Sequence, residues 1–365
     1  MRSCKSKVAH SNKGQGRGRA YGILPWLALL SLMLIVGACG TNNGPSDASE
    51  AASTTEQASA PNADPATTPA DSGSEQAEAT IKHDYGETTI PANPKRIVSI
   101  GMEDMLLSLD VPLVQAFSTD GYYLDAQIKE KGIPINSSFD INLEAIAAAA
   151  PDLIIMNTYM TDQAGYEQIS KIAPTIAFIR DNWQSVIVDI GRALGKEDAA
   201  QSVLQSYRDQ VEQAKASIVQ AVGEGKTVAF IRPSTKDVEL DFPEWTWTAA
   251  LYNDLGLSPD PKVLEFQQSS ADDWGGTMLS LEKLPELTAD YLFMDYGSSM
   301  ASESDFQQEV AKSSEVEKMN VWKAIPAVAQ GHAFKVSARH WALNGPIADG
   351  MKIDDVVQTL TAIKQ

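Results

Sequence analysis

The chain has 365 residues and a formal net charge of −19 at pH 7, because 48 Asp and Glu outnumber 29 Lys and Arg. Such an acidic balance argues against nucleic acid as a partner, since phosphates would be repelled. The two cysteines, Cys4 and Cys39, both lie near the N-terminus, so we expect a folded part without disulfides that depends on burial of its core.

Residues 1–38 have the pattern of an export signal. Six basic residues precede an uncharged apolar run from Tyr21 to Ala38. Small residues directly precede Cys39, which resembles the bacterial lipoprotein signal. We therefore expect a cleaved signal peptide and lipidation of Cys39, which would anchor the protein to the cell membrane on its extracytoplasmic face. A retained transmembrane helix is the alternative, because a run of this length can just span ~30 Å of hydrocarbon.

Residues 39–80 are predicted to form a flexible acidic linker. The stretch from Gly40 to Ala79 contains no aromatic or large aliphatic residue and no basic residue, but many Ala, Ser, Thr and Pro. Such a sequence cannot bury enough apolar surface to offset the loss of chain entropy on folding. We expect it to hold a folded domain away from the membrane.

From residue 81 onward, short β-branched runs alternate with helical stretches, which is typical of α/β units with largely parallel sheets. We assign residues 81–182 to an N-terminal lobe. Its predicted strands are Arg96–Ile100, Leu113–Phe117, Asp152–Met156 and Thr175–Ile179, and its predicted helices are Glu103–Leu109, Asp125–Lys131, Leu143–Ala150 and Gly165–Ile172.

Residues 183–224 are predicted to be a helical bridge, interrupted only near Gly195. Its second part, Glu197–Val222, would be about 39 Å long at 1.5 Å per residue, which is enough to connect two lobes. A C-terminal lobe, residues 225–365, follows. Its predicted strands are Thr227–Ile231, Tyr291–Met294 and Ala333–Val336, and a last helix is expected over Ile347–Ile363.

A weak internal repeat supports two related lobes. A helix that opens Leu143-Glu144 precedes the strand Leu153–Met156, and a similar phrase that opens Leu281-Glu282 precedes Tyr291–Met294.

With these elements in order, the chain resembles the helical-backbone class of ABC-importer substrate-binding proteins, which serves siderophores, haem and cobalamin. The resemblance covers nearly all of residues 81–365, and the order and spacing of its motifs are more specific than any one motif. It implies two Rossmann-like α/β lobes bridged by one long α-helix, the class III arrangement, with the ligand between the lobes and no cofactor. The motifs are Pro94–Ser99, Leu143–Ile146 with Pro151–Ile155, Ile172–Thr175, Gly191–Glu197, Trp322–Val328, and Trp341–Ala348 with Asp354 and Asp355.

The resemblance also implies that one glutamate on each lobe pairs with an arginine of a dimeric membrane permease. Carried onto the repeat, this pair is Glu144 and Glu282. One carboxylate per lobe would let the permease sense the spacing of the lobes. The alternative is that both are ordinary solvated glutamates in the first turn of a helix, where the helix dipole favours them. We expect the binding protein itself to be a monomer.

Three arginines follow predicted strands and are candidates for one anionic ligand. They are Arg180, Arg232 and Arg339. Because ligand-binding loops of α/β sheets gather at the carboxyl ends of strands, these side chains could converge on a cleft. A surface ion pair is the alternative for each of them.

Aromatic side chains near the same loops are candidates for the apolar part of the cleft. His340 and Trp341 continue the Arg339 loop, and Trp245 and Trp247 lie in a Pro-containing loop. In the first lobe, Tyr159 and the pair Tyr122 and Tyr123 follow predicted strands. Packing against the core is the alternative for all of them.

The arginine set and the segment His340–Ala348 favour a ferric siderophore of the carboxylate or mixed citrate-hydroxamate type. Haem or cobalamin is the alternative, in which case His340 or Tyr159 would be candidates for the axial ligand of haem iron. We predict no direct metal site, because His10, His83, His332 and His340 include no close pair at ligand spacing.

The sequence contains no complete motif of the enzyme classes considered. The segment Gly223–Thr227 ends like a phosphate-binding loop, but Gln220 stands where that motif requires glycine, and a strand follows. Neither Gly-x-Ser-x-Gly nor His-Glu-x-x-His occurs. An exported lipoprotein hydrolase is a distant alternative, which turnover of chromogenic esters would reveal. A pure envelope scaffold is a third, and it would bind no chelate.

Overall fold

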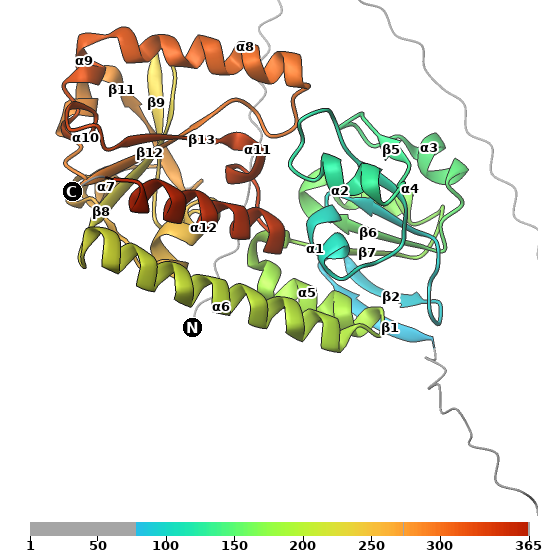
Figure 1. The fold of residues 1–365 in the computed structure, drawn as a ribbon. Coiled ribbons are helices and arrows are strands. Elements are labelled where there is room, and N and C mark those ends of the chain that lie inside the picture. The colour runs from blue at the N-terminus through green and yellow to red at the C-terminus, as the bar shows by residue number, and fades with distance from the viewer. Residues whose placement is uncertain (1–77, 273, 364–365) are drawn as a thin grey trace, which may run out of the picture. The chain divides into compact units, whose positions relative to one another are not determined.

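The computed structural model describes residues 78–272 and 274–363. The predicted signal peptide, the lipidation of Cys39 and most of the predicted linker lie outside these residues. Within the described part of the chain, no helix combines the length and the apolar character needed to cross a membrane. The described residues form two α/β lobes, with the long helix α6 (Glu197–Val222) along one side (Figure 1).

The first lobe begins with an antiparallel hairpin that the sequence analysis did not predict. Strand β1 (Ala79–His83) pairs with β2 (Gly86–Ile90), and β1 begins two residues before the expected start of the lobe at residue 81. The turn residue Asp84 donates its backbone N–H to the carbonyl of Ala177 at 2.9 Å. The hairpin is thereby fixed beside the edge of the main sheet.

The main sheet of the first lobe is parallel, in the order β5-β4-β3-β6-β7. The central strands are continuous apolar runs, as expected for strands covered on both faces. The strands are β3 (Ile97–Ile100), β4 (Leu113–Phe117), β5 (Ile135–Asn136), β6 (Leu153–Asn157) and β7 (Thr175–Phe178). The helices are α1 (Glu103–Ser108), α2 (Asp125–Glu130), α3 (Leu143–Ala148) and α4 (Gln163–Ile169). The predicted elements of this lobe are confirmed to within two or three residues.

The bridge consists of α5 (Trp183–Ala193) and α6, separated by a short break at the predicted place. Buried residues of α6 recur every three or four positions and form one stripe: Ala200, Leu204, Tyr207, Val211, Ala214 and Ile218. This spacing is that of an amphipathic helix with one face against the core. The stripe packs against α5 and against α12 (Pro346–Thr361) of the second lobe.

The second lobe has a mixed sheet in the order β11-β9-β8-β12-β13, with β10 (Ser258–Pro259) beside β8. The predicted strands β8 (Thr227–Pro233), β12 (Tyr291–Tyr296) and β13 (Ala333–Ser337) are parallel to one another. Strands β9 (Asp237–Asp241) and β11 (Gly276–Ser280) were not predicted, and they extend the sheet in antiparallel orientation.

Helices cover both faces of this sheet (Figure 1). They are α7 (Pro261–Ser269), α8 (Glu303–Ser313), α9 (Asn320–Lys323), α10 (Pro326–Ala329), α11 (Ala338–Trp341) and α12. Short 3-10 or π-helical segments lie at Thr158–Met160, Arg180–Asn182, Ala250–Asp254, Leu281–Glu286 and Ser314–Lys318.

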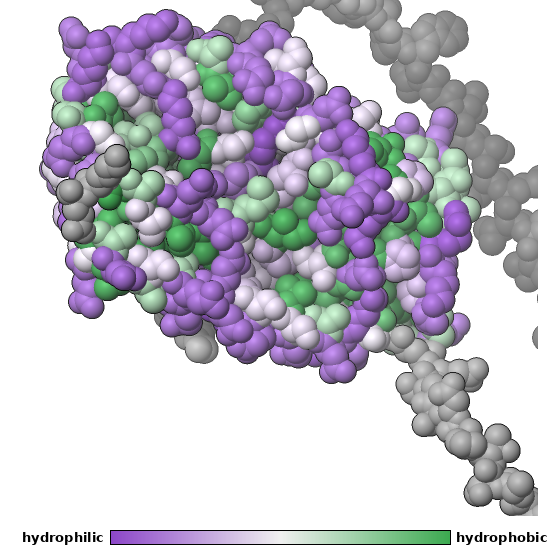
Figure 2. Space-filling model, viewed as in Figure 1, coloured by the Kyte–Doolittle hydropathy of each residue, from purple (hydrophilic) through white to green (hydrophobic). Residues whose placement is uncertain are grey.

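One hydrophobic core runs from the first lobe through α5, α6 and α12 into the second lobe. Two further clusters fill the opposite face of each sheet. The surface seen in Figure 2 is mostly hydrophilic, with hydrophobic residues in small separate areas. Because this core is continuous across the bridge, both lobes pack against the same helices, α5, α6 and α12.

Candidate ligand-binding site

A hollow opens at the carboxyl ends of the first-lobe strands, where α/β sheets place their ligands. It encloses about 950 Å³ of space free of atoms, including the part open to solvent. Residues at or just after the ends of β3, β4, β5, β6 and β7 line it: Gly101, Phe117, Asn136, Asn157 and Arg180. The second lobe contributes Ser299, Met300 and Leu343. The hollow therefore lies between the lobes.

Aromatic rings form much of the wall. Phe117 meets Tyr122 edge to face with ring centroids 5.3 Å apart, and Phe139 on its other side at 6.2 Å. Tyr122 is buried, whereas Phe139 and Tyr159 are 52% and 60% exposed. Exposed rings that line a hollow offer apolar contact to a bulky ligand.

Arg180 is the cation of this hollow. Its Nη1 donates to the carbonyl oxygen of Gly101 at 3.3 Å, and this is the one hydrogen bond that its side chain forms with the described residues. A guanidinium has five N–H donors, so most of them stay available to a ligand. Arg180 was among the predicted ligand contacts, and the structure places it on the wall.

Glu103, at the start of α1, is a buried carboxylate on the same wall, with 2% of its surface exposed. Its Oε1 accepts the backbone N–H of Gly101 at 3.3 Å and that of Phe117 at 3.2 Å. Burial raises the pKa of the Tyr122 phenol, and the charge of Glu103 adds to the rise. The Tyr122 hydroxyl therefore stays protonated at neutral pH.

The two candidate axial ligands for haem iron are both engaged with carboxylates. The Tyr159 hydroxyl donates to Asp181, and burial together with this hydrogen bond raises the Tyr159 pKa, which disfavours the phenolate. His340 is buried, with its Nε2 2.8 Å from Oδ2 of Asp355. Tyr159 lines the hollow and His340 does not.

Arg232 does not line this hollow. It lies inside β8, where Nη2 is 2.7 Å from Oδ2 of the buried Asp295 and Nη1 is 3.9 Å from Glu239. Its guanidinium carbon is 5.1 Å from the centroid of the Trp247 ring. The neighbouring strands β9 and β12 thus supply its partners, and it forms part of the wall of a separate hollow in the second lobe.

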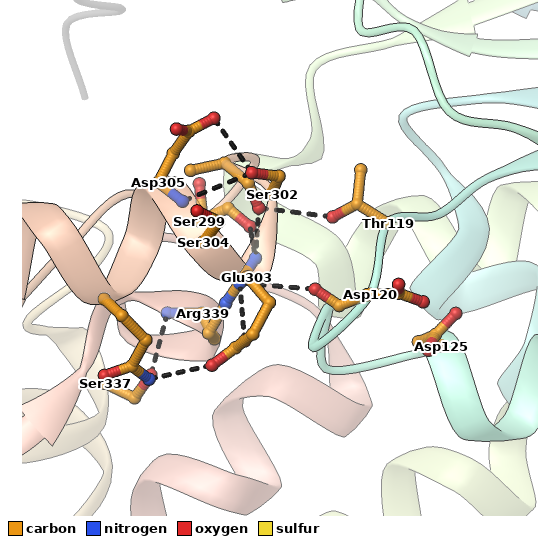
Figure 3. Close-up of polar contacts among 12 residues, drawn as sticks. Thr119, Asp120, Asp125, Ser299, Ser302, Glu303, Ser304, Asp305, Ser337 and Arg339 are labelled. Carbon is orange, nitrogen blue, oxygen red and sulfur yellow. Dashed lines mark hydrogen bonds and ion pairs between the residues drawn. The ribbon is translucent and has the colours of Figure 1, made fainter.

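Arg339 lies at a contact between the lobes (Figure 3). Within its own lobe, Nη1 donates to the Ala301 carbonyl at 2.6 Å and Nη2 is 3.1 Å from Oε2 of Glu303. Across the lobe boundary, Nη2 donates to the Asp120 carbonyl at 3.4 Å. Only 5% of Arg339 is exposed, and it does not line the hollow. The three predicted arginines therefore do not converge, and Arg180 alone among them lines the hollow.

Trp341 is a core residue and does not face the hollow. It is fully buried, and its ring stacks on Phe230 at 5.2 Å and on Phe293 at 6.0 Å. Its indole Nε1 donates to Asp355 at 2.7 Å. The prediction that Trp341 contacts the ligand is therefore wrong, because α11 turns this side chain onto the sheet.

The other aromatic candidates also lie away from the hollow. Trp245 and Trp247 pack edge to face, with ring centroids 5.3 Å apart, in the second lobe. Tyr123 does not line the hollow, and its hydroxyl donates to Asp104 at 2.8 Å. Of the predicted tyrosines, Tyr159 and Tyr122 line the wall.

Several lining residues were not predicted, namely Glu103, Phe117, Asn136, Phe139, Asn142, Asn157 and Met160. Asn136 and Asn157 are the last residues of β5 and β6, so the rule that sites gather at the carboxyl ends of parallel strands would have found them. Phe139 lies in a loop with no comparable signal.

The two predicted docking glutamates are exposed. Glu144 lies in the first turn of α3, whose N-cap Asn142 accepts the N–H of Ala145 at 3.0 Å and also lines the hollow. Glu282 lies in the first turn of Leu281–Glu286. Their pairing with a permease stays a prediction.

Comparison with known proteins agrees with this architecture. The family model described as periplasmic binding protein matches residues 105–339. The Bacillus subtilis "Probable siderophore-binding lipoprotein YfiY" is 28% identical over 288 residues, which cover 76% of this chain and 86% of that protein. The B. subtilis "Iron(3+)-hydroxamate-binding protein FhuD" is 28% identical over 292 residues, which cover 77% and 86%.

A solved structure shows the same fold. It is a B. subtilis protein of the FhuD fold family, a periplasmic binding protein component of a Fep/Fec-like ferrichrome ABC transporter. It is 26% identical to this chain, with a TM-score of 0.64, and the match covers 77% of this chain and 100% of that one.

Proposed function

Because the chain belongs to the periplasmic binding protein family, we propose that it is the substrate-binding component of an ABC importer and that it captures a ferric siderophore. Relatives named as siderophore-binding and iron(3+)-hydroxamate-binding proteins support this function. The observation that carries it here is the hollow between the lobes, which combines aromatic walls with the available guanidinium of Arg180. Capture is reversible binding, and delivery to the permease follows.

The charge of the hollow favours a hydroxamate chelate over a citrate chelate. Three hydroxamate groups cancel the charge of Fe(III), whereas citrate complexes remain anionic. Arg180 faces the hollow together with two carboxylates, Glu103 and Asp140. An anionic chelate would therefore meet like charges in a partly desolvated site, which is unfavourable. The expectation of a carboxylate or mixed citrate-hydroxamate siderophore depended on three converging arginines and on the segment His340–Ala348, and two of the arginines have protein partners.

Isothermal titration of the folded domain with ferric ferrioxamine B, ferrichrome, ferric citrate, haem and cobalamin tests the ligand class. We expect a hydroxamate complex to bind at least tenfold more tightly than the other compounds. Tighter binding of ferric citrate would contradict the hydroxamate assignment, and tighter binding of haem or cobalamin would contradict the siderophore assignment.

The role of Arg180 has its own test. Loss of a charged hydrogen bond costs roughly 1.5 to 3 kcal/mol, so Arg180→Ala should weaken hydroxamate binding by about tenfold or more. Arg192→Ala is the matched control, because Arg192 is an exposed arginine of α5 whose ion pair with Asp189 lies outside the hollow. Equal affinity of the Arg180 variant and the parent protein would remove Arg180 from the site.

Membrane attachment and permease docking complete the proposal. Lipidated Cys39 would hold the protein on the extracytoplasmic face of the membrane, and Glu144 and Glu282 would pair with arginines of the permease dimer. The double variant Glu144→Ala and Glu282→Ala should slow iron uptake by cells while leaving chelate affinity in solution unchanged. Normal uptake by this variant would contradict docking through these residues.

A further inference from the structure

Glu103 has a carboxylate oxygen without a partner at the wall of the hollow. Oε1 takes both hydrogen bonds that the side chain receives, from the backbone N–H groups of Gly101 and Phe117. Oε2 forms no hydrogen bond or ion pair with the residues that the structure describes. Because Glu103 is otherwise buried and lines the hollow, Oε2 faces the space that a ligand would fill.

Glu103 forms no ion pair with the residues that the structure describes. Arg180 is the cation on this wall, but the structure shows no ion pair between the two side chains, and the guanidinium is bonded to the Gly101 carbonyl. Asp140, also on the wall, adds a second negative charge. Oε2 does not belong to the fully buried polar atoms that lack a partner, so it is accessible from the hollow, where a ligand donor could replace water. The structural role of Glu103, which is to accept the two backbone N–H groups, uses Oε1 alone. It leaves Oε2 able to contact a ligand.

From this geometry we propose that Oε2 of Glu103 receives a hydrogen bond from a protonated amine of the bound chelate, and that Glu103 thereby selects hydroxamate chelates that carry an ammonium group. This inference depends on the proposed function, since it names the kind of hydroxamate chelate that the hollow prefers. Arg180 would contact the oxygens around the iron while Glu103 contacts the cationic end. The two side chains are held on opposite backbone groups of Gly101, so the hollow offers adjacent positive and negative contacts.

A pair of chelates that differ in one charge tests the proposal. Ferric ferrioxamine B carries a free ammonium group, and acetylation of that amine gives a neutral chelate with the same iron centre. A charged hydrogen bond corresponds to roughly tenfold or more in affinity, so the parent protein should prefer the ammonium form by that factor. The preference should persist at high salt, because the general attraction of an acidic protein for cations is screened whereas a contact in a partly buried site is screened much less.

Glu103→Gln is the informative variant, since the amide oxygen can still accept the N–H groups of Gly101 and Phe117 while the charge is removed. It should bring the two chelates to within about twofold of each other, with little change for the acetylated form. Glu130→Gln is the matched control, because Glu130 is an exposed carboxylate of α2 that does not line the hollow, and it should retain the preference.

The possible outcomes separate the two levels of inference. Equal binding of both chelates by the parent protein overturns the role of Glu103 and leaves the siderophore function standing. An equal loss of affinity for both chelates in Glu103→Gln also overturns it, because a purely structural residue would behave in this way. Failure of the parent protein to bind either hydroxamate overturns the proposed ligand class and this inference together.

Discussion

Substitution of Asp104 should change how the free energy of unfolding depends on pH. It belongs to α1 of the first lobe and is buried at the N-terminus of α12 of the second lobe. Oδ1 accepts the backbone N–H of Ile347 at 2.8 Å, and Oδ2 accepts that of Ala348 at 2.9 Å and the Tyr123 hydroxyl at 2.8 Å. A carboxylate from one lobe thus caps a helix of the other. Gly345 leaves room for it, since a Cβ there would lie 2.5 Å from the Asp104 carboxyl carbon.

Burial raises the pKa of Asp104 from 3.8 to about 6, against the opposing effect of its three hydrogen bonds. Because the folded-state pKa lies above the unfolded value, the folded protein holds this proton more tightly than the unfolded chain. The resulting stabilisation is complete below pH 3.8, declines as the pH rises, and is lost above pH 6. Between pH 8 and pH 4, this linkage adds about 2 kcal/mol to the free energy of unfolding.

Asp104→Asn removes the titration. The variant should be less stable at every pH, because an amide has one accepting oxygen for three donors. Its deficit relative to the parent protein should be about 2 kcal/mol larger at pH 4 than at pH 8, since the parent alone gains from protonation. Urea unfolding across this range gives the two curves. Asp354→Asn, an exposed carboxylate on the same helix, controls for loss of one negative charge. A deficit that is constant with pH, or one that grows toward pH 8, would refute the reasoning.

Two further predictions concern packing. Trp341→Ala should lower the free energy of unfolding by about 3 to 5 kcal/mol in urea titrations, because Trp341 is a core residue, and a loss of under 1 kcal/mol would be inconsistent with its stacking. Gly121→Ala should destabilise by about 1 to 3 kcal/mol in the same assay, since its φ is +80° and a Cβ would displace the carboxylate of Glu303 from Arg339. Gly132→Ala, with φ +64° and no atom within 4 Å of its Cβ, should cost only the backbone strain, and an equal cost at both glycines would show that the pair of Glu303 and Arg339 adds nothing to stability.

The sequence predicts the backbone of this protein better than its site. The bounds of α6 and β4 agree with prediction because their periodicity and flanking residues are local signals. The sequence did not predict the hairpin β1-β2 or the antiparallel strands β9 and β11. Their residues are a mixture of polar and apolar types, and their pairing depends on the strands beside them. Within that limit, the repeat of apolar strands and helices is enough to place two lobes and a bridge.

Side-chain partners explain most of the differences at the site. Arg232 follows an apolar run, as a cleft arginine would, but Asp295 meets it from a strand that is 63 residues further along. Trp341 follows a strand in the same way, and the short helix α11 turns it inward. Arg180 has no such carboxylate partner in the described residues, so it stays on the wall of the hollow. Position at the end of a strand therefore identifies candidate ligand-binding residues. Which of them can contact a ligand depends on whether a partner from a distant part of the sequence already binds the side chain.

The contact shown in Figure 3 relates ligand binding to the arrangement of the lobes. The second-lobe wall of the hollow includes Ser299 and Met300, and the next residue, Ala301, accepts hydrogen bonds from Arg339 of its own lobe and from the Thr119 hydroxyl of the first lobe at 3.3 Å. Any movement that separates this segment from the first lobe must break the Thr119 bond and the bond from Arg339 to Asp120. Each such bond contributes roughly 0.5 to 3 kcal/mol, which is comparable to one good ligand contact. A chelate that touches both walls can therefore strengthen or weaken this contact between the lobes.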